Sequence, residues 1–274
     1  AIVLALEIFP VGSKIVASRD LYGGSFRWFN DQQKRGIFDF TYVVTEADML
    51  AAITPETDIV YIETPTNPLM IEVDIAKVSQ KAHENGAKVI VDNTFYTPIY
   101  QQPLVLGADI VVHSATKFIG GHGTAIGGVI VDSGNFDWMA HADKYPGLCT
   151  PDESYHGITY AEKFGKEGAF ITKCTAQLMR DFGSMQSPQN AFLLNVGLET
   201  LHLRMQRHCE NAQKVAEYLV NNDKIAWVNY SGLKDNKYYG LAQKYMPNGS
   251  CGVISFGLKG GRDASIEFMD KLKM

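Results

Sequence analysis

The sequence has 274 residues, of which 46% are hydrophobic and 20% are charged, a composition typical of a folded globular protein. The formal net charge of −5 disfavours nucleic acid and anionic membranes as partners. The four cysteines are widely spaced without a CxxC pair, which argues against a disulfide scaffold. The histidines have no metal-ligand spacing. We therefore expect a cytoplasmic protein without a metal site or a membrane span.

Both ends of the chain have helical patterns that look cut. The first residues, AIVLALEIF, form an apolar helical pattern without an initiating Met. Residues 265–274 form an amphipathic helical pattern, and no further element follows it. We expect the sequence to be part of a longer protein.

Short apolar runs alternate with helical patterns in the first half of the chain. Residues 73–84, for example, place Ile75, Val78 and Ala82 at helical spacing, and Gly86 follows as a natural C-cap. This alternation predicts an α/β fold with a mostly parallel sheet flanked by helices. The expected strands are rich in Val and Ile, as strands buried on both faces are, and comprise 14–18, 57–63, 87–92, 108–114 and 127–132.

Long helical patterns dominate the second half of the chain. Residues 160–180 and 188–221 are predicted helices, and two further strands are predicted at 226–230 and 252–258. The apolar stripe of the second helix consists of Leu194, Leu198, Leu201 and Met205. We predict a large α/β domain over residues 1–180, connecting helices over 181–222, and the start of a smaller α+β domain over 223–274.

Polar side chains follow three of the predicted strands. Asn67 lies just after the second strand, Asp92 ends the third, and Ser114, Thr116 and Lys117 come at the end of the fourth, before a run of glycines. Open α/β sheets bind ligands at the carboxyl ends of their strands. We therefore expect these side chains to lie around one site.

The pairing of Asp92 with Lys117 has two interpretations. A buried carboxylate needs a positive partner, so a purely structural ion pair is the simpler one. The hydroxyls of Ser114 and Thr116 beside glycines favour the other, in which donors bind a phosphate next to an amine. A lysine, an acid and a phosphate cup are what pyridoxal 5′-phosphate (PLP) requires.

Several ordered motifs support a resemblance that covers essentially the whole chain. The sequence resembles the Cys/Met-metabolism family of fold-type I PLP enzymes, which includes O-acetylhomoserine sulfhydrylases, cystathionine γ-synthases and lyases, and methionine γ-lyases. The motifs are LYGG at 21–24, ETPTNP at 63–68, VDNT at 91–94, SATK at 114–117 and GGH at 120–122.

The resemblance implies a role for three of these residues at the cofactor ring. Lys117 would hold PLP covalently and later move protons, and Asp92 would pair with the pyridine nitrogen. Tyr22 would stack on the ring face; without the resemblance, a core tyrosine would be the better interpretation.

The resemblance also implies contacts to the edges of the cofactor. Asn67 would contact the 3′-oxygen, although Thr-Asn-Pro is also good turn chemistry. Ser114 and Thr116 would bind the phosphate. His113 and His122 receive no role, because a structural histidine is more common at such positions.

Three features bear on which member of the family the chain resembles. Gly24 stands where methionine γ-lyases have a cysteine, and Gly123-Thr124 follows the pattern of the sulfhydrylases, whereas Thr64–Pro68 is closer to the cystathionine enzymes. The resemblance implies a sulfhydrylase, which replaces the acetate of O-acetylhomoserine with sulfide to give homocysteine. Alternatives are a cystathionine γ-synthase, a cystathionine or methionine lyase, and a non-catalytic scaffold.

The resemblance further implies a homotetramer built as a dimer of dimers. The family's phosphate loop would precede Ala1, and the arginine that binds the substrate carboxylate would follow Met274.

Overall fold

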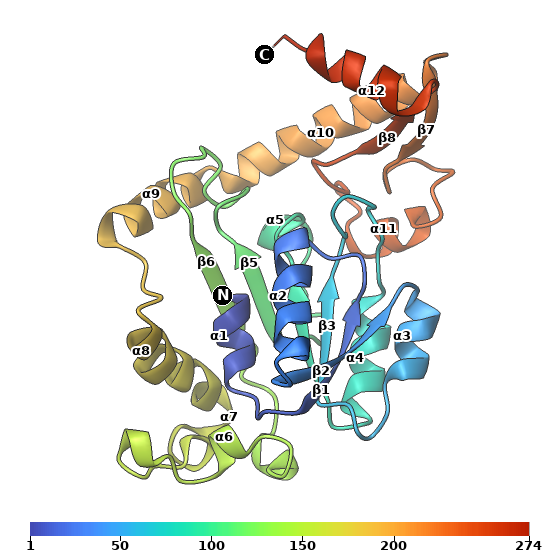
Figure 1. The fold of residues 1–274 in the computed structure, drawn as a ribbon. Helices are drawn as coiled ribbons and strands as arrows, with labels where there is room; N and C mark the ends of the chain where they lie inside the picture. The colour runs from blue at the N-terminus through green and yellow to red at the C-terminus, as the bar shows by residue number, and fades with distance from the viewer. Residues whose placement is uncertain (274) are drawn as a thin grey trace.

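The computed structural model describes residues 1–273 and contains a six-stranded sheet in the order β2-β1-β3-β4-β5-β6 (Figure 1). The first five strands pair in parallel, and β6 is antiparallel to β5. The predicted mostly parallel α/β sheet is therefore confirmed. The strands are β1 (Ser13–Ser18), β2 (Phe38–Val43), β3 (Ile59–Glu63), β4 (Lys88–Asp92), β5 (Ile110–Ser114) and β6 (Gly128–Asp132).

One strand of this sheet, β2, is absent from the predictions. It lies at the sheet edge beside β1, and its side chains alternate: Phe38 and Phe40 are buried, whereas Asp39 and Thr41 are exposed. The other strands were found as continuous apolar runs, and a strand with alternating side chains contains no such run. The expected burial on both faces is wrong for β6, the other edge strand, where Val129 is 38% and Val131 is 40% exposed.

Helices cover both faces of the sheet, which makes three layers (Figure 1). On one face, the Tyr61 ring of β3 meets Phe29 of α2 edge-on, with 5.0 Å between centroids. On the other, Val60 belongs to the same apolar cluster as Val78 of α4, because successive strand residues point to opposite faces. The first face packs against α1 (Ile2–Glu7), α2 (Gly23–Lys34) and α7 (Tyr160–Thr172), and the second against α3 (Glu46–Ala52) and α4 (Ile75–His83).

Several short helices lie in the connections. They are α5 (Thr97–Tyr100), η1 (Met139–His141), α6 (Pro146–Cys149) and η2 (Glu153–Tyr155).

The predicted helix at 160–180 is interrupted. It consists of α7, a π-helical segment (Lys173–Met179) and α8 (Arg180–Phe182). Gly165 leaves helical geometry at φ 64° and ψ −177°, a conformation that glycine tolerates because it has no Cβ.

The predicted continuous helix over 188–221 is wrong, because the chain leaves helical geometry at Thr200. It forms α9 (Pro188–Glu199) and α10 (Leu201–Val220), with Thr200 at φ −104° and ψ 4° between them. Leu201 and Met205 are buried as predicted, but Leu198 is 45% exposed. Leu194 packs against the same apolar cluster as Leu201 and Met205, so the stripe continues across the break except at Leu198.

A smaller unit follows at the far end of α10 (Figure 1). Tyr230, Met246 and Cys251 are buried in one cluster with Ala212 and Ala216 of α10. Both predicted strands are confirmed, the second only from Ser255. The predicted terminal helix begins earlier than expected, and Met274 lies outside the described residues. The elements are β7 (Ile225–Asn229), α11 (Tyr239–Tyr245), β8 (Ser255–Leu258), antiparallel to β7, and α12 (Gly261–Asp270).

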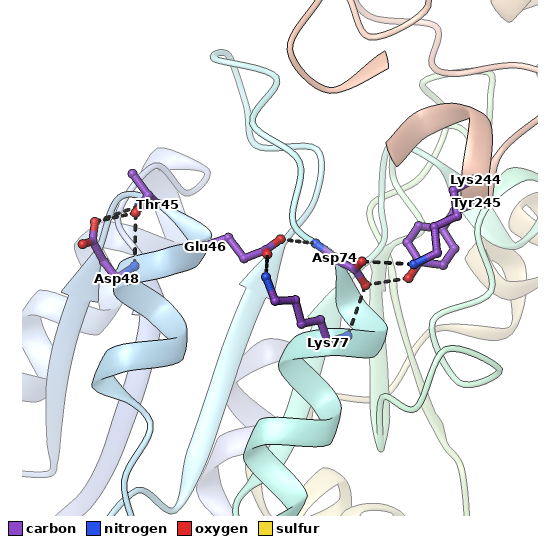
Figure 2. Close-up of polar contacts among 7 residues, drawn as sticks. All are labelled: Thr45, Glu46, Asp48, Asp74, Lys77, Lys244 and Tyr245. Carbon is purple, nitrogen blue, oxygen red and sulfur yellow. Dashed lines mark hydrogen bonds and ion pairs between the residues drawn. The ribbon is translucent and has the colours of Figure 1, made fainter. Parts of the chain in front are cut away.

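Asp74 connects this smaller unit to the large sheet (Figure 2). Its Oδ1 caps α4 by accepting the backbone NH of Lys77 at 3.1 Å, and also accepts the Tyr245 hydroxyl of α11 at 2.5 Å. Lys244 pairs with Oδ2 at 3.2 Å. Partial burial disfavours the charged form of Asp74, but these three donors outweigh it and hold its pKa below the usual value. One carboxylate thus caps a helix and holds α11 in place.

No helix among residues 1–273 is long and apolar enough to cross a membrane.

Lys88, at the start of β4, is fully buried and has no hydrogen-bond partner within residues 1–273. Its Nζ lies 3.9 Å from the ring centroid of Phe136 and 3.8 Å from that of Trp138. Burial lowers the Lys88 pKa to about 8, against the opposing effect of Asp109 and Asp132. The ammonium is therefore only partly compensated by its surroundings.

We expect Lys88→Met to change how stability depends on pH. The Lys88 pKa is about 8 in the fold and 10.5 in its absence, so the unfolded state binds more protons between these values. The free energy of unfolding of the wild type should therefore rise from pH 8 to pH 10 relative to the variant. Urea unfolding of both proteins at several pH values measures this. If the difference in free energy of unfolding between the wild type and Lys88→Met stays constant with pH, the prediction is wrong.

Candidate active site at the carboxyl edge of the sheet

Strands β3, β4 and β5 end at the same edge of the sheet, in Glu63, Asp92 and Ser114 respectively. Glu63 is the register partner of Asp92. The predicted grouping of Asp92 and Ser114 at one edge is therefore present in the structure, and Glu63 joins them.

Asp92 is 8% exposed. Its Oδ1 accepts hydrogen bonds from the backbone NH of Thr94, at 3.1 Å, and from the Thr94 hydroxyl. The same hydroxyl oxygen accepts the backbone NH of Ser114 at 2.9 Å. Burial raises the pKa of Asp92, and the Thr94 hydrogen bonds oppose this. Thr94, which was not predicted as a site residue, thus connects the ends of β4 and β5.

Lys117 lies in the turn after β5, and its side chain is exposed. Its backbone NH bonds to Ser114 at 3.2 Å, and its carbonyl accepts the NH of Gly121 at 2.8 Å. The structural ion pair with Asp92 does not form, and no ion pair to Asp92 occurs within residues 1–273. The Lys117 amine is therefore available to a ligand.

Arg204 of α10 holds the backbone that follows Lys117. Its guanidinium donates to the carbonyls of Phe118 at 2.7 Å, Ile119 at 3.3 Å and Gly197 at 2.6 Å. The chain segments are so close here that a Cβ on Gly197 would lie 2.1 Å from the Gly120 carbonyl oxygen. Arg204 therefore clamps the lysine loop between β5 and α10. No spacing pattern in the sequence indicates this role, because its partners are backbone atoms.

The two predicted phosphate-binding hydroxyls differ in their contacts. The Thr116 hydroxyl accepts the backbone NH of Gly127 at 3.1 Å and donates to the Gly127 carbonyl at 3.3 Å. The hydroxyl of Ser114 has no such partner among residues 1–273. Ser114 can therefore bind an anion directly, whereas Thr116 would first exchange its bond to the Gly127 carbonyl.

Tyr22 and Asn67 are connected to the same edge through Glu63. Tyr22 precedes α2, and its side chain is 53% exposed, so it is not a core tyrosine. Its backbone NH donates to Glu63 Oε2 at 2.9 Å, and that of Asn67 donates to Oε1 at 3.1 Å. A Cβ on Gly24 would lie 2.5 Å from the Tyr22 ring. The ring thus occupies the space that a side chain at position 24 would need.

These side chains fit PLP. The buried Asp92 carboxylate forms no ion pair within residues 1–273, and a protonated pyridine nitrogen would supply a cationic partner. Lys117 offers an exposed amine from the next strand end, and Ser114 a free hydroxyl. An exposed aromatic ring, Tyr22, stands on a neighbouring loop. This fold and this set of groups define the class of PLP-dependent enzymes.

The match to known families agrees with that class. Residues 1–274 match the family described as Cys/Met metabolism PLP-dependent enzyme. The chain belongs to this family, as its motifs indicate.

Curated relatives and a solved structure resemble the chain over most of its length. A homocysteine synthase from Schizosaccharomyces pombe is 42% identical across all of this chain and 65% of its own length. An O-acetyl-L-homoserine sulfhydrylase from Leptospira meyeri is 43% identical across 98% of this chain and 63% of its own. The chain thus spans less than two thirds of these relatives.

A crystal structure from Campylobacter jejuni, named as an O-acetylhomoserine (thiol)-lyase, superimposes with a TM-score of 0.86 at 32% identity. The match covers 93% of this chain and 63% of that one. The Campylobacter protein contains N′-pyridoxyl-lysine-5′-monophosphate.

We expect Arg204→Ala to loosen the loop that carries Lys117. The change removes three hydrogen bonds from a charged donor to buried carbonyls and should cost about 2 kcal/mol of stability. Hydrogen exchange at residues 115–124 should rise more than in the rest of the sheet. Arg207→Ala is the matched control, since Arg207 is exposed on the same helix. This change should lower the stability by less than about 0.5 kcal/mol. Equal hydrogen exchange at residues 115–124 in the two variants would show that Arg204 does not hold this loop.

Proposed function

We propose that the protein is a PLP-dependent transferase that replaces the acetate of O-acetylhomoserine with sulfide and so forms homocysteine. The observation that carries the PLP chemistry is a buried Asp92 carboxylate that forms no ion pair within residues 1–273, with the exposed Lys117 amine just after the end of the neighbouring strand. The substrate is supported by relatives named homocysteine synthase and O-acetyl-L-homoserine sulfhydrylase in several organisms.

Lys117 and Asp92 would do the chemical work. When bound, PLP supplies an electron-accepting ring that makes the substrate's Cα–H acidic. Asp92 would keep the pyridine nitrogen protonated, since a buried carboxylate binds a cationic donor strongly. Lys117 would hold the cofactor and, once released by substrate, carry protons at Cα and Cβ.

The other predicted residues would orient the cofactor. Tyr22 would stack on the ring face and Asn67 would contact the 3′-oxygen. Ser114 and Thr116 would bind the phosphate, Ser114 through its free hydroxyl and Thr116 after exchange of a hydrogen bond with Gly127.

The product distinguishes this function from its alternatives. The purified full-length protein with PLP would receive O-acetylhomoserine together with sulfide and cysteine, and the products would be identified by mass spectrometry. We expect homocysteine as the main product. Cystathionine would contradict the sulfhydrylase assignment in favour of a synthase, and no product would favour the non-catalytic scaffold.

A matched variant tests the role of the lysine. Lys117→Ala should abolish turnover, and the wild type treated with borohydride in the presence of PLP should carry a pyridoxyl group on Lys117 in peptide mapping. A pyridoxyl group on another lysine would contradict the assignment.

We also propose the three-part division into residues 1–180, 181–222 and 223–274, and a cytoplasmic location. All four cysteines are free, and three of them are buried, which supports a reducing compartment.

We propose in addition that the protein is a homotetramer, arranged as a dimer of dimers. Large apolar side chains lie exposed on and between α8 and α9, and a second copy of the chain would cover them. The side chains and their exposed fractions are Phe182 (55%), Met185 (64%), Phe192 (61%), Val196 (42%) and Leu198 (45%).

Size-exclusion chromatography with light scattering measures this assembly. We expect a mass of four chains for the wild type and a smaller species for Phe192→Glu, because a charge would be buried at the interface. Val105→Glu is the control, since Val105 is also apolar and exposed (78%) but lies on the loop before β5, outside α8 and α9. A monomeric wild type would contradict the proposal.

A further inference from the structure

Glu63 joins three segments of the candidate site. It ends β3 next to Asp92, its register partner on β4. One carboxyl oxygen accepts the backbone NH of Tyr22 at 2.9 Å, and the other accepts that of Asn67 at 3.1 Å. These two residues come from separate loops, one before α2 and one after β3. A single side chain therefore holds both loops that carry the proposed ring contacts.

The burial of the Glu63 carboxyl group costs free energy of folding. It is 6% exposed and forms no ion pair within residues 1–273. Burial, followed by the charge of Asp92, raises its pKa to about 8, while the two backbone donors oppose this shift. An apolar side chain would avoid the cost of burial but would leave two backbone NH groups without an acceptor.

We infer that Glu63 is a positioning residue for the cofactor: by accepting both backbone NH groups, it fixes Tyr22 and Asn67 in register with Asp92. The inference rests on the proposed function, in which these three residues contact the PLP ring. Glu63 itself touches no cofactor atom in this scheme, because both its oxygens are engaged with the backbone.

A purely structural role is the competing explanation. The carboxyl group of Glu63 lies at the start of α2, where Tyr22 is the N-cap and has no side-chain cap, so it could serve only to stabilise that helix. In that case its loss would lower the stability of the fold without a specific effect on the cofactor.

The test compares PLP binding with stability in three variants of the full-length protein. Glu63→Gln retains the shape but replaces one acceptor by a donor, and Glu63→Asp retains the carboxyl group but is too short to reach both loops. Glu72→Gln is the matched control, since Glu72 is 3% exposed and bonded to Tyr96 in a different apolar cluster. PLP affinity is measured by absorbance titration, and stability by thermal unfolding without PLP.

We expect both Glu63 variants to weaken PLP binding about ten-fold, the effect of losing one good hydrogen bond. Glu72→Gln should change PLP affinity less than about two-fold, even where it lowers the melting temperature as much. A Glu63→Asp variant that binds PLP like the wild type would show that contact with both loops is not required and would overturn the inference. Equal effects of Glu63→Gln and Glu72→Gln on PLP affinity would overturn it too.

A second comparison asks whether Glu63 acts through its two partners. A Tyr22→Ala, Asn67→Ala background removes the two ring contacts that Glu63 would position. Glu63→Gln should then change PLP affinity less than about two-fold. A ten-fold loss that persists in this background would overturn the inference.

The measurement of PLP affinity tests this inference separately from the product analysis, which tests the proposed function. A wild type that binds PLP but forms cystathionine would contradict the substrate assignment and leave the Glu63 comparison intact. A wild type that binds no PLP would overturn both.

Discussion

Negative charge buried at the carboxyl edge of the sheet is the constraint around which the site is built. Asp92 and Glu63 end adjacent parallel strands, are both nearly inaccessible to water, and form no ion pair among residues 1–273. Two such carboxyl groups disfavour each other's ionisation. The protein compensates with hydrogen bonds: Thr94 donates to Asp92, and the backbone of two loops donates to Glu63. The remaining demand for positive charge is what a protonated pyridine would meet.

The site combines a fixed backbone with accessible side chains. The turn that carries Lys117 is held by Arg204 of α10, and the chain before α2 is held by Glu63. The side chains of Lys117 and Tyr22 are nevertheless exposed. Ordering the backbone in advance reduces the entropy that a ligand must remove on binding, while the exposed groups remain free to contact it.

The sequence was informative where a residue's environment is local. Five strands of the large sheet could be predicted, because each is a continuous apolar run, and Asp92 stood out as an acid at the end of one. The edge strand β2 was missed because its side chains alternate, and the break at Thr200 because periodicity continues across it. Glu63 was noticed only as part of a motif, and Arg204 not at all. The partners named above are backbone atoms, and a backbone atom leaves no trace in the spacing or composition of side chains.

Gly24 has a consequence for how this site can evolve. Because a Cβ at position 24 would collide with the Tyr22 ring, the two positions are coupled: a lineage that acquires a side chain at 24 must turn the ring as well. Tyr22 is half exposed, so this reorientation needs no change in the core. A single substitution at a glycine can therefore alter the aromatic wall of the site while the fold stays the same, which offers a short mutational path between related activities.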